Sequence, residues 1–397
     1  MRAAAREPSF QEAAAALEEL AEVKISGRQL TRIAHEVGGE LQARRDQQVE
    51  QFRRGELGRD VTTRPALAVV EVDGGRLQVR GTGEGPGAHD GGWREDKFAF
   101  LATAAITASP SDPEPELPDC FRDREFVEGL VRGITGQGPL CGADPPPEGP
   151  PDPLPHLPDS QPAVRNRPEL LVRTYVASMS PSAEFGPMVA AEARRRNFEN
   201  AARRVFVGDG SAWIWALQRE FFPTYQAVVD LLHVLGHVFA AAKAAADGAL
   251  ARWTLFQAWA EAIWKGQAIR VTTELRALRD ASGPLSEEEV EGWADDDPRK
   301  IFAQGLGYLE RNASRMDYPR YRQEGLPWTS SHMESTVKIF NRRVKGSEKF
   351  WGESGAETIL QLRAGLLSED DRLRRHFKTR PSSPFRTYKA REKAKAA

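Results

Sequence analysis

Residues 67–77 read LAVVEVDGGRL, and residues 204–215 read RVFVGDGSAWIW. Each stretch contains an apolar, Val-rich run that ends at an aspartate, Asp73 in the first and Asp209 in the second. Runs of this length and composition predict buried strands, and the pattern after Asp209 changes to a helical one. Gly74 and Gly75 permit a bend or a tight turn directly after Asp73. The sequence therefore predicts two aspartates at the ends of two strands.

A third acidic residue, Glu334, lies in WTSSHMESTVKIFNRRVKG, residues 328–346, which have helical spacing. Lys338, Arg342 and Lys345 follow it at steps of four, four and three, on or near its own face of the helix. Two carboxylates at strand ends and one on this helix can hold two cations about 4 Å apart, the spacing used in in-line phosphoryl displacement. Hard carboxylate oxygens favour Mg²⁺ or Mn²⁺ over Zn²⁺. We therefore expect Asp73, Asp209 and Glu334 to form a two-metal site.

The remaining periodicity predicts an α/β fold. Further strands are expected at residues 98–106, 170–179 and 226–230, with helices at 183–201 and 211–222. Three strands followed by alternating helix and strand are the order of an RNase H-like domain with a mixed sheet. Residues 240–325 carry helical patterns and no strand signal, so they are expected to form an all-helical insertion. Its Trp253, Trp259 and Trp264 either pack the core of the insertion or stack on an unpaired base.

These patterns divide the chain into four regions. Residues 1–64 form an N-terminal helical region, and residues 65–239 and 326–366 together form the catalytic domain. Residues 240–325 form the insertion, and residues 367–397 form a basic tail. Ten prolines at 139–162 predict an exposed, extended loop. Residues 25–41, ISGRQLTRIAHEVGGEL, resemble a small helix-turn-helix with Gly38 or Gly39 at the bend. The alternative is a helical arm that packs on the catalytic domain or on a second subunit.

Composition limits the class of protein. With 397 residues and 40% hydrophobic content, the chain can form two or three domains with a sizeable core. Cys120 and Cys141 make no CxxC pair, which argues against a disulfide scaffold or a structural zinc site and fits a reducing cytoplasm. No apolar run approaches the roughly 18 residues of a membrane span, and no signal peptide is visible. We therefore expect a cytoplasmic protein.

Charge is distributed unevenly along the chain. The formal net charge is -2, but residues 320–397 contain 18 Lys and Arg against 9 Asp and Glu. This basic end includes Glu334 and finishes in a tail that would add salt-dependent phosphate contacts. A solvated tail without such contacts is the alternative. On the helix, Lys338, Arg342, Arg343 and Lys345 are expected to position DNA through its phosphates without reading bases.

Several sequence blocks together resemble a known family. They are VDGGRLQ at 72–78, GWREDK at 92–97, RTYVAS at 173–178, FVGDGSAWIW at 206–215, FFP at 221–223 with VVDLLHVLGHV at 228–238, and ES and RRVKG before FWGESGAETILQLRA at 350–364. In this order, between about residues 38 and 363, they are similar to insertion-sequence transposases of the DDE superfamily. The most similar branch is the Kra-type bacterial family, which is related to the Mutator-like transposases.

The resemblance implies a function and a set of site residues. Asp73, Asp209 and Glu334 would be the catalytic triad on an RNase H-like fold and would bind two Mg²⁺ or Mn²⁺ ions. Asp230 and His233 match the Asp-x-x-His element of the group and would position the substrate or support the metal carboxylates. The implied activity is cleavage and transfer of transposon-end DNA by a homodimer or larger assembly in the bacterial nucleoid. A domesticated or decayed copy that binds DNA without cutting it is the alternative.

Overall fold

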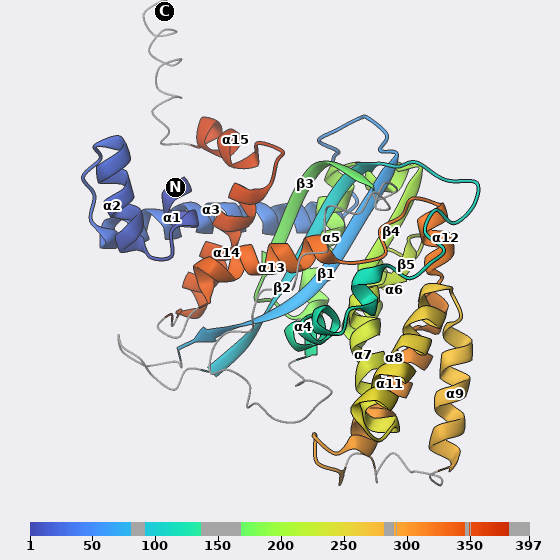
Figure 1. The fold of residues 1–397 in the computed structure, drawn as a ribbon. Coiled ribbons are helices and arrows are strands. Elements are labelled where there is room, and N and C mark those ends of the chain that lie inside the picture. The colour runs from blue at the N-terminus through green and yellow to red at the C-terminus, as the bar shows by residue number, and fades with distance from the viewer. Residues whose placement is uncertain are drawn as a thin grey trace, which may run out of the picture.

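A five-stranded mixed sheet lies at the centre of the computed structural model, which describes residues 1–80, 92–135, 168–281, 290, 292–345, 349 and 351–380 (Figure 1). The order across the sheet is β3-β2-β1-β4-β5. The strands are β1 (Leu67–Val79), β2 (Gly92–Ala105), β3 (Glu169–Ser178), β4 (Arg203–Gly208) and β5 (Gln226–Val229). With helices on both sides of this sheet, the expected α/β class is confirmed.

The strand register brings the ends of β4 and β5 beside the middle of β1. β2 runs antiparallel to β1 and β3, whereas β4 pairs in parallel with both β1 and β5. Val72 lies opposite Gly208, and Gly208 lies opposite Val229. The residues that follow these three are Asp73, Asp209 and Asp230, so the three aspartates form a row across neighbouring strands. Asp209 and Asp230 directly follow their strands as predicted, but Asp73 lies inside β1, and the strand end predicted there is wrong.

β1 continues past Asp73, and the turn expected at Gly74 and Gly75 is wrong. Residues Gly74 to Val79 pair with β2, which begins at Gly92 and therefore includes the GWREDK block. Gly75 lies opposite Asp96, and a Cβ atom at Gly75 would lie only 2.6 Å from Oδ1 of Asp96. This position thus needs glycine because the carboxyl group of Asp96 lies where a side chain would stand, and not because the chain turns.

The N-terminal region consists of α1 (Arg2–Arg6), α2 (Phe10–Ala21) and α3 (Gly27–Arg53). Helix α3 is continuous through Gly38 and Gly39, so the helix-turn-helix with its bend there is wrong. A Cβ atom at Gly38 would lie 2.2 Å from the carbonyl oxygen of Thr358 in α14 (Glu353–Leu367). Glycine lets the two helices approach closely, and in Figure 1 α3 lies beside α14. The helical arm therefore packs on the rest of its own chain.

Helices cover the sheet and its β3 edge. α13 (Ser331–Val344) packs on β1 and β2, and α14 packs on β3. α5 (Ser182–Arg195) contacts β2, β3 and α3, and also packs on α6 (Ala212–Phe221). The shorter elements are η1 (Asp119–Arg122), α4 (Arg124–Thr135) and η3 (Phe198–Asn200).

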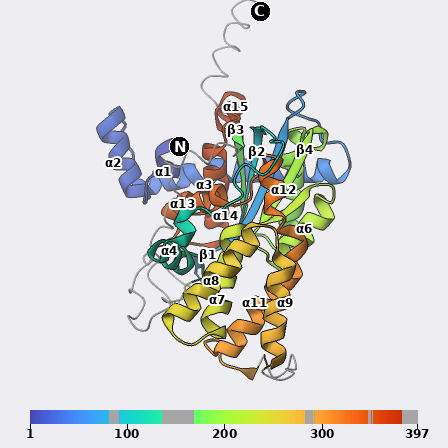
Figure 2. The same cartoon turned by 45° about the vertical axis from the view of Figure 1, so that its right-hand side comes forward.

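The described residues between β5 and α13 form helices and no strand. They are α7 (Leu231–Ala245), α8 (Ala249–Trp264), α9 (Ala268–Ala281), α11 (Pro298–Asn312), η4 (Ala313–Arg315) and α12 (Tyr318–Gln323). Figure 2 shows α7, α8, α9 and α11 grouped below the sheet. Trp259 and Trp264 are buried, and their indole N–H groups donate to Glu274 at 2.8 Å and to the Glu114 carbonyl at 2.9 Å. With Trp253 packed against the core, these rings serve packing in this structure.

Residues 367–380 of the expected basic tail lie in the described part of the chain and include a helix. α15 (Arg372–Thr379) is folded, and the guanidinium of Arg372 pairs with Glu192 and Asp370. Residues 381–397 lie outside the described part of the chain, as does the Pro-rich stretch at 139–162. Among the helices that the structure describes, none is both long enough and apolar enough to cross a bilayer.

Candidate metal centre at the ends of three strands

Asp73 is the candidate ligand on β1, and it is half-buried. Its Oδ1 accepts a hydrogen bond from the Gly74 amide at 2.7 Å. Burial and the negative charge of Asp209 raise the pKa of Asp73 to about 6, while His233 and the Gly74 amide act in the opposite direction. This electrostatic coupling places the two predicted carboxylates near one another, although 136 positions separate them in sequence.

Asp209 follows β4 and is held by groups on both sides. Its Oδ1 accepts from the Ser211 amide at 2.7 Å, and its Oδ2 accepts from the Ser211 hydroxyl at 2.8 Å. The hydroxyl of Tyr308 in α11 donates to the Asp209 carbonyl oxygen at 2.7 Å. Gly210 has a φ of +98°, and the Tyr308 ring fills the space where a Cβ atom would stand. The loop at Asp209 therefore needs glycine twice, for its backbone conformation and for the aromatic ring.

Asp230 follows β5 and forms a buried ion pair with His233. Oδ1 accepts from the Leu232 amide at 2.8 Å, and Oδ2 lies 3.1 Å from Nδ1 of His233. Burial alone would lower the pKa of His233, but the hydrogen bond to Asp230 and the charges of Asp209 and Asp73 raise it to about 10. The hydrogen bond to Asp230 and the charges of the other two aspartates therefore favour the imidazolium form of His233. His237, one turn later in α7, instead stacks on Tyr308 with ring centroids 3.7 Å apart.

The start of α13 is tied to the same end of the sheet. The Met333 amide donates to Oε2 of Glu71 at 3.0 Å, and Glu71 lies two residues before Asp73 on β1. The hydroxyl of Ser330 donates to Asp230 and makes no capping bond to the helix, and Glu71 accepts from the first turn of α13 instead. Glu334 directly follows Met333, which brings its backbone to the three strand ends. The Glu334 side chain lies outside the described part of the structure.

The basic residues of α13 fall into two groups. Lys338, Arg342 and Lys345 are exposed, as side chains that bind phosphate must be. Arg343 is only 2% exposed, and its guanidinium donates to the carbonyl oxygens of Ala4 at 3.0 Å and Pro8 at 3.2 Å. The assignment of Arg343 to phosphate binding is therefore wrong, because this side chain fastens the N-terminal helices to α13.

Asp96 is an acidic residue of this region that the sequence did not single out. It is completely buried on β2, and neither oxygen of its carboxyl group accepts a hydrogen bond from another described side chain or amide. Burial, together with the charge of Asp73, raises the pKa of Asp96 to about 7, while its own backbone amide, Lys345 and Lys97 oppose the shift. A carboxyl group in such surroundings is largely neutral below pH 7.

The donor chemistry of the strand ends suits a hard cation. Asp73 and Asp209 offer carboxylate oxygens, the ligands that Mg²⁺ and Mn²⁺ prefer, and their like charges disfavour each other without a cation. Asp230 differs because Leu232, His233 and Ser330 already occupy its two oxygens. In the described part of the chain, no three His, Cys, Asp or Glu side chains are grouped closely enough to hold a metal ion.

Some supporting residues had a sequence signal and others had none. Glu71 is a charged residue inside an apolar strand, which in itself indicates a buried partner. Asp96 lies in the GWREDK block, where the neighbouring residues are also charged, so the local pattern does not distinguish it. Tyr308 lies 99 residues after Asp209, and no local pattern connects the two. Comparison with protein-family models and with curated protein sequences finds no match to this chain.

Proposed function

We propose that this protein is a DDE-type DNA transposase, a metal-dependent enzyme that cleaves DNA strands and joins them to a target. The observation that carries the proposal is the row of Asp73 in β1, Asp209 after β4 and Asp230 after β5, with the start of α13 fastened to the same place. Acidic residues brought to neighbouring strands from distant positions, such as Asp73 and Asp209, are what a polynucleotidyl transferase requires.

The fold we propose is RNase H-like. In support, three antiparallel strands are followed by β4 and β5, which extend the sheet in parallel on the other side of β1. The helices from α8 to α12 would then be the insertion that separates β5 from the helix carrying the glutamate. This insertion also contributes to the site, because Tyr308 holds the Asp209 loop.

Asp73, Asp209 and Glu334 would hold Mg²⁺ or Mn²⁺. When bound, such ions would supply Lewis-acid activation of the attacking oxygen and neutralise charge on the phosphate. Asp230 and His233 would keep the strand ends in register and place a positive charge beside the carboxylates. Exposed Lys338, Arg342 and Lys345 would hold the DNA backbone in place without reading its sequence. Two DNA ends must be held together, so we also propose a homodimer or larger assembly acting at the bacterial nucleoid.

The test is strand cleavage of a plasmid that carries the DNA flanking the gene, with millimolar Mg²⁺ or with EDTA. We expect cleavage only with metal, and Asp209→Asn should lower its rate by on the order of 10³-fold or more. Asp247→Asn, an exposed aspartate in the loop after α7, is the matched control and should cleave as the parent does. DNA binding should survive in both variants, because binding rests on other residues.

Two outcomes would count against the proposal in different ways. Binding without metal-dependent cleavage by the parent protein would favour the alternative of a DNA-binding protein that has lost catalysis. Cleavage that persists in Asp209→Asn at the parent rate would mean that the acidic residues after the strands do not form the catalytic site.

A further inference from the structure

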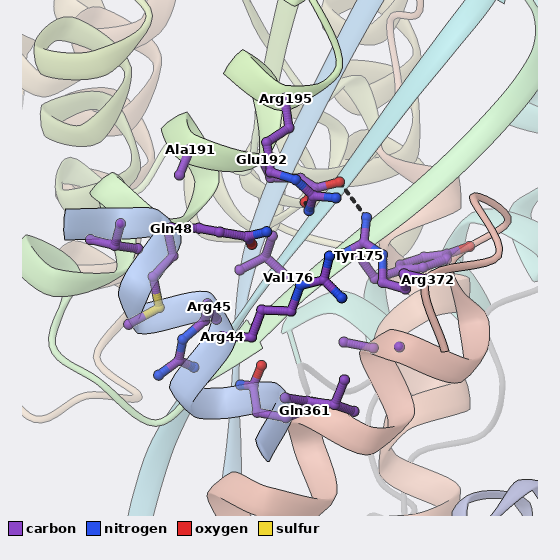
Figure 3. A pocket seen from close by; sticks show the side chains of 15 residues that line it. Arg44, Arg45, Gln48, Tyr175, Val176, Ala191, Glu192, Arg195, Gln361 and Arg372 are labelled. Carbon is purple, nitrogen blue, oxygen red and sulfur yellow. Dashed lines mark hydrogen bonds and ion pairs between the residues drawn. The ribbon is translucent and has the colours of Figure 1, made fainter. Parts of the chain in front are cut away.

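A pocket lined by arginines lies at the β3 edge of the sheet, opposite the edge that ends in β5. Its volume is about 70 Å³, and its walls come from α3, β3, α5, α14 and α15 (Figure 3). One buried water needs roughly 10–15 Å³ of such cavity volume, so the pocket has room for a group of several oxygen atoms. Four arginines line it, namely Arg44, Arg45, Arg195 and Arg372, together with the carboxylate of Glu192.

Three of the four arginines have acidic partners. Arg45 pairs with Glu357 and Asp46, Arg195 with Glu192 and Asp60, and Arg372 with Glu192 and Asp370. Burial would raise the pKa of Glu192, but Arg372 and Arg195 hold it at about 2, so this carboxylate stays charged. The walls of the pocket are therefore built from fixed ion pairs.

The fourth arginine, Arg44, has no such partner. Its guanidinium makes no hydrogen bond or ion pair with any residue in the described part of the chain, although Figure 3 shows it reaching from α3 toward the other arginines. Partial burial lowers the pKa of Arg44, and the positive charges of Arg195, Arg375 and Arg372 lower it further, while Asp60 opposes them. Because a guanidinium does not lose its proton in proteins, an anion bound between these arginines would relieve the repulsion.

A second observation points to a ligand in the same place. Arg195 is 5% exposed, and its Nε atom is a buried donor without an acceptor in the described structure. The Gln48 amide also lines the pocket, and no described residue hydrogen-bonds to it. A buried donor left without an acceptor is costly and uncommon in native proteins. The pocket thus combines one unpaired positive charge with unfilled donors on two different helices.

We propose that this pocket binds one tetrahedral oxyanion of the phosphate class, held by Arg44 and Gln48 from α3 beside the guanidinium of Arg195 from α5. Arg44 is exposed at the entrance, so an anion can enter from solvent. The ion pairs of Arg45, Arg195 and Arg372 hold the walls in place before the anion arrives. The anion would also link α3 to α5 and so fasten the N-terminal region to the domain that carries the sheet. The site is separate from the three aspartates, and its test needs no DNA cleavage.

Calorimetric titration and thermal unfolding with inorganic phosphate, against sodium chloride at equal ionic strength, test the proposal. Phosphate should bind one to one and raise the Tm, and chloride should not. Arg44→Gln should weaken phosphate binding by about 10-fold or more, as expected for one charge-assisted hydrogen bond. Arg32→Gln is the matched control, since Arg32 is an exposed arginine on the same helix and lies outside the pocket. It should bind phosphate as the parent does.

A charge reversal gives a second readout. Arg44→Glu should abolish phosphate binding and also raise the Tm in chloride, because a carboxylate at this position would pair with the neighbouring arginines. Equal stabilisation of the parent by phosphate and chloride, or unchanged phosphate binding by Arg44→Gln, would overturn the proposal.

The phosphate could be free or could belong to a nucleic acid. A dinucleotide with a 5′ phosphate, titrated beside inorganic phosphate and the unphosphorylated dinucleotide, separates the two sources. Tighter binding of the phosphorylated dinucleotide than of inorganic phosphate would identify the end of a nucleic acid as the ligand. Equal or weaker binding of the phosphorylated dinucleotide would identify a free anion as the ligand. In Arg44→Gln, the affinity for whichever of the two ligands binds more tightly should fall.

Discussion

The end of β5 and the start of β2 each bury an aspartate completely, and the two residues are held in opposite ways. Asp230, after β5, receives hydrogen bonds from the Leu232 amide, His233 and Ser330, and these hold its pKa below the ordinary value although burial would raise it. Asp96, on β2, receives none from another described residue, and burial raises its pKa to about 7. Hydrogen-bond partners, and not depth in the protein, decide whether a buried carboxyl group is charged.

The largest effect on stability is expected at Asp230. Asp230→Ala leaves His233 without its counter-ion and removes the acceptors of the Leu232 amide and the Ser330 hydroxyl. Breaking a buried pair in this way costs about 3–5 kcal/mol of unfolding free energy. Urea unfolding measures it, with Asp247→Ala as an exposed control that should change stability by less than about 0.5 kcal/mol. A cost below about 1 kcal/mol would show that the pair does not hold the strand ends together.

The opposite sign is expected at Asp96. Its pKa is raised in the folded protein, so its contribution to stability is present at low pH and is lost as the pH rises from about 4 through 7. Asp96→Asn removes the buried charge and should stabilise the protein by on the order of 2 kcal/mol at pH 8, and by less at pH 5. Unfolding by urea at both pH values measures the difference. A variant that is less stable than the parent at pH 8 would mean that the ionised Asp96 has a favourable partner.

A similar contrast exists between two neighbouring cations of α13. Arg343→Ala should cost about 2–4 kcal/mol, because the buried guanidinium bonds to Ala4 and Pro8 and lies 4.3 Å from the Phe10 ring centroid. Changing exposed Lys338, Arg342 and Lys345 together to Ala should leave stability within about 0.5 kcal/mol of the parent. For binding to duplex DNA, the slope of log affinity against log salt concentration should be smaller in this triple variant, by up to about 0.9 for each phosphate that is no longer neutralised. Unfolding and DNA titrations at several salt concentrations test both. If the triple variant keeps its slope, α13 does not hold the phosphates.

The sequence predicts most of the sheet because each strand contains an apolar run. It predicts Asp209 and Asp230 directly after β4 and β5, and the register brings them beside Asp73, but Asp73 lies inside β1 and not at its end. It fails at Gly75 and Gly38, where glycine permits a close approach to Asp96 or Thr358, which lie far away in the chain. A local pattern cannot distinguish a glycine that turns the chain from one that makes room for a neighbour.

The same limit applies to the charged residues. Arg342 and Arg343 are adjacent and chemically identical, and only the position of the N-terminal helices decides which one is buried. The arginine pocket is still further from prediction, because its lining comes from five elements between Leu41 and Arg372. A site of this kind has no sequence motif. It is visible only when the hydrogen-bond partner of each buried donor is sought in the folded protein.

The smallest effect separates the end of β4 from the end of β5. Tyr308→Phe removes the hydrogen bond to the Asp209 carbonyl oxygen and keeps the ring that stacks on His237, so it should cost about 1 kcal/mol of stability. Tyr318→Phe is a matched control, because its hydroxyl donates to the Val229 carbonyl at 3.0 Å, one residue before Asp230. Both variants lose one bond from a buried tyrosine, but only Tyr308 bonds to the backbone of a residue whose carboxylate is proposed to hold metal. Mn²⁺ affinity, measured by calorimetry without DNA, should therefore fall by about 10-fold in Tyr308→Phe and stay unchanged in Tyr318→Phe. Equal losses of affinity in the two variants would show that the ends of β4 and β5 do not differ in this way, and that Asp230 belongs to the metal site as well.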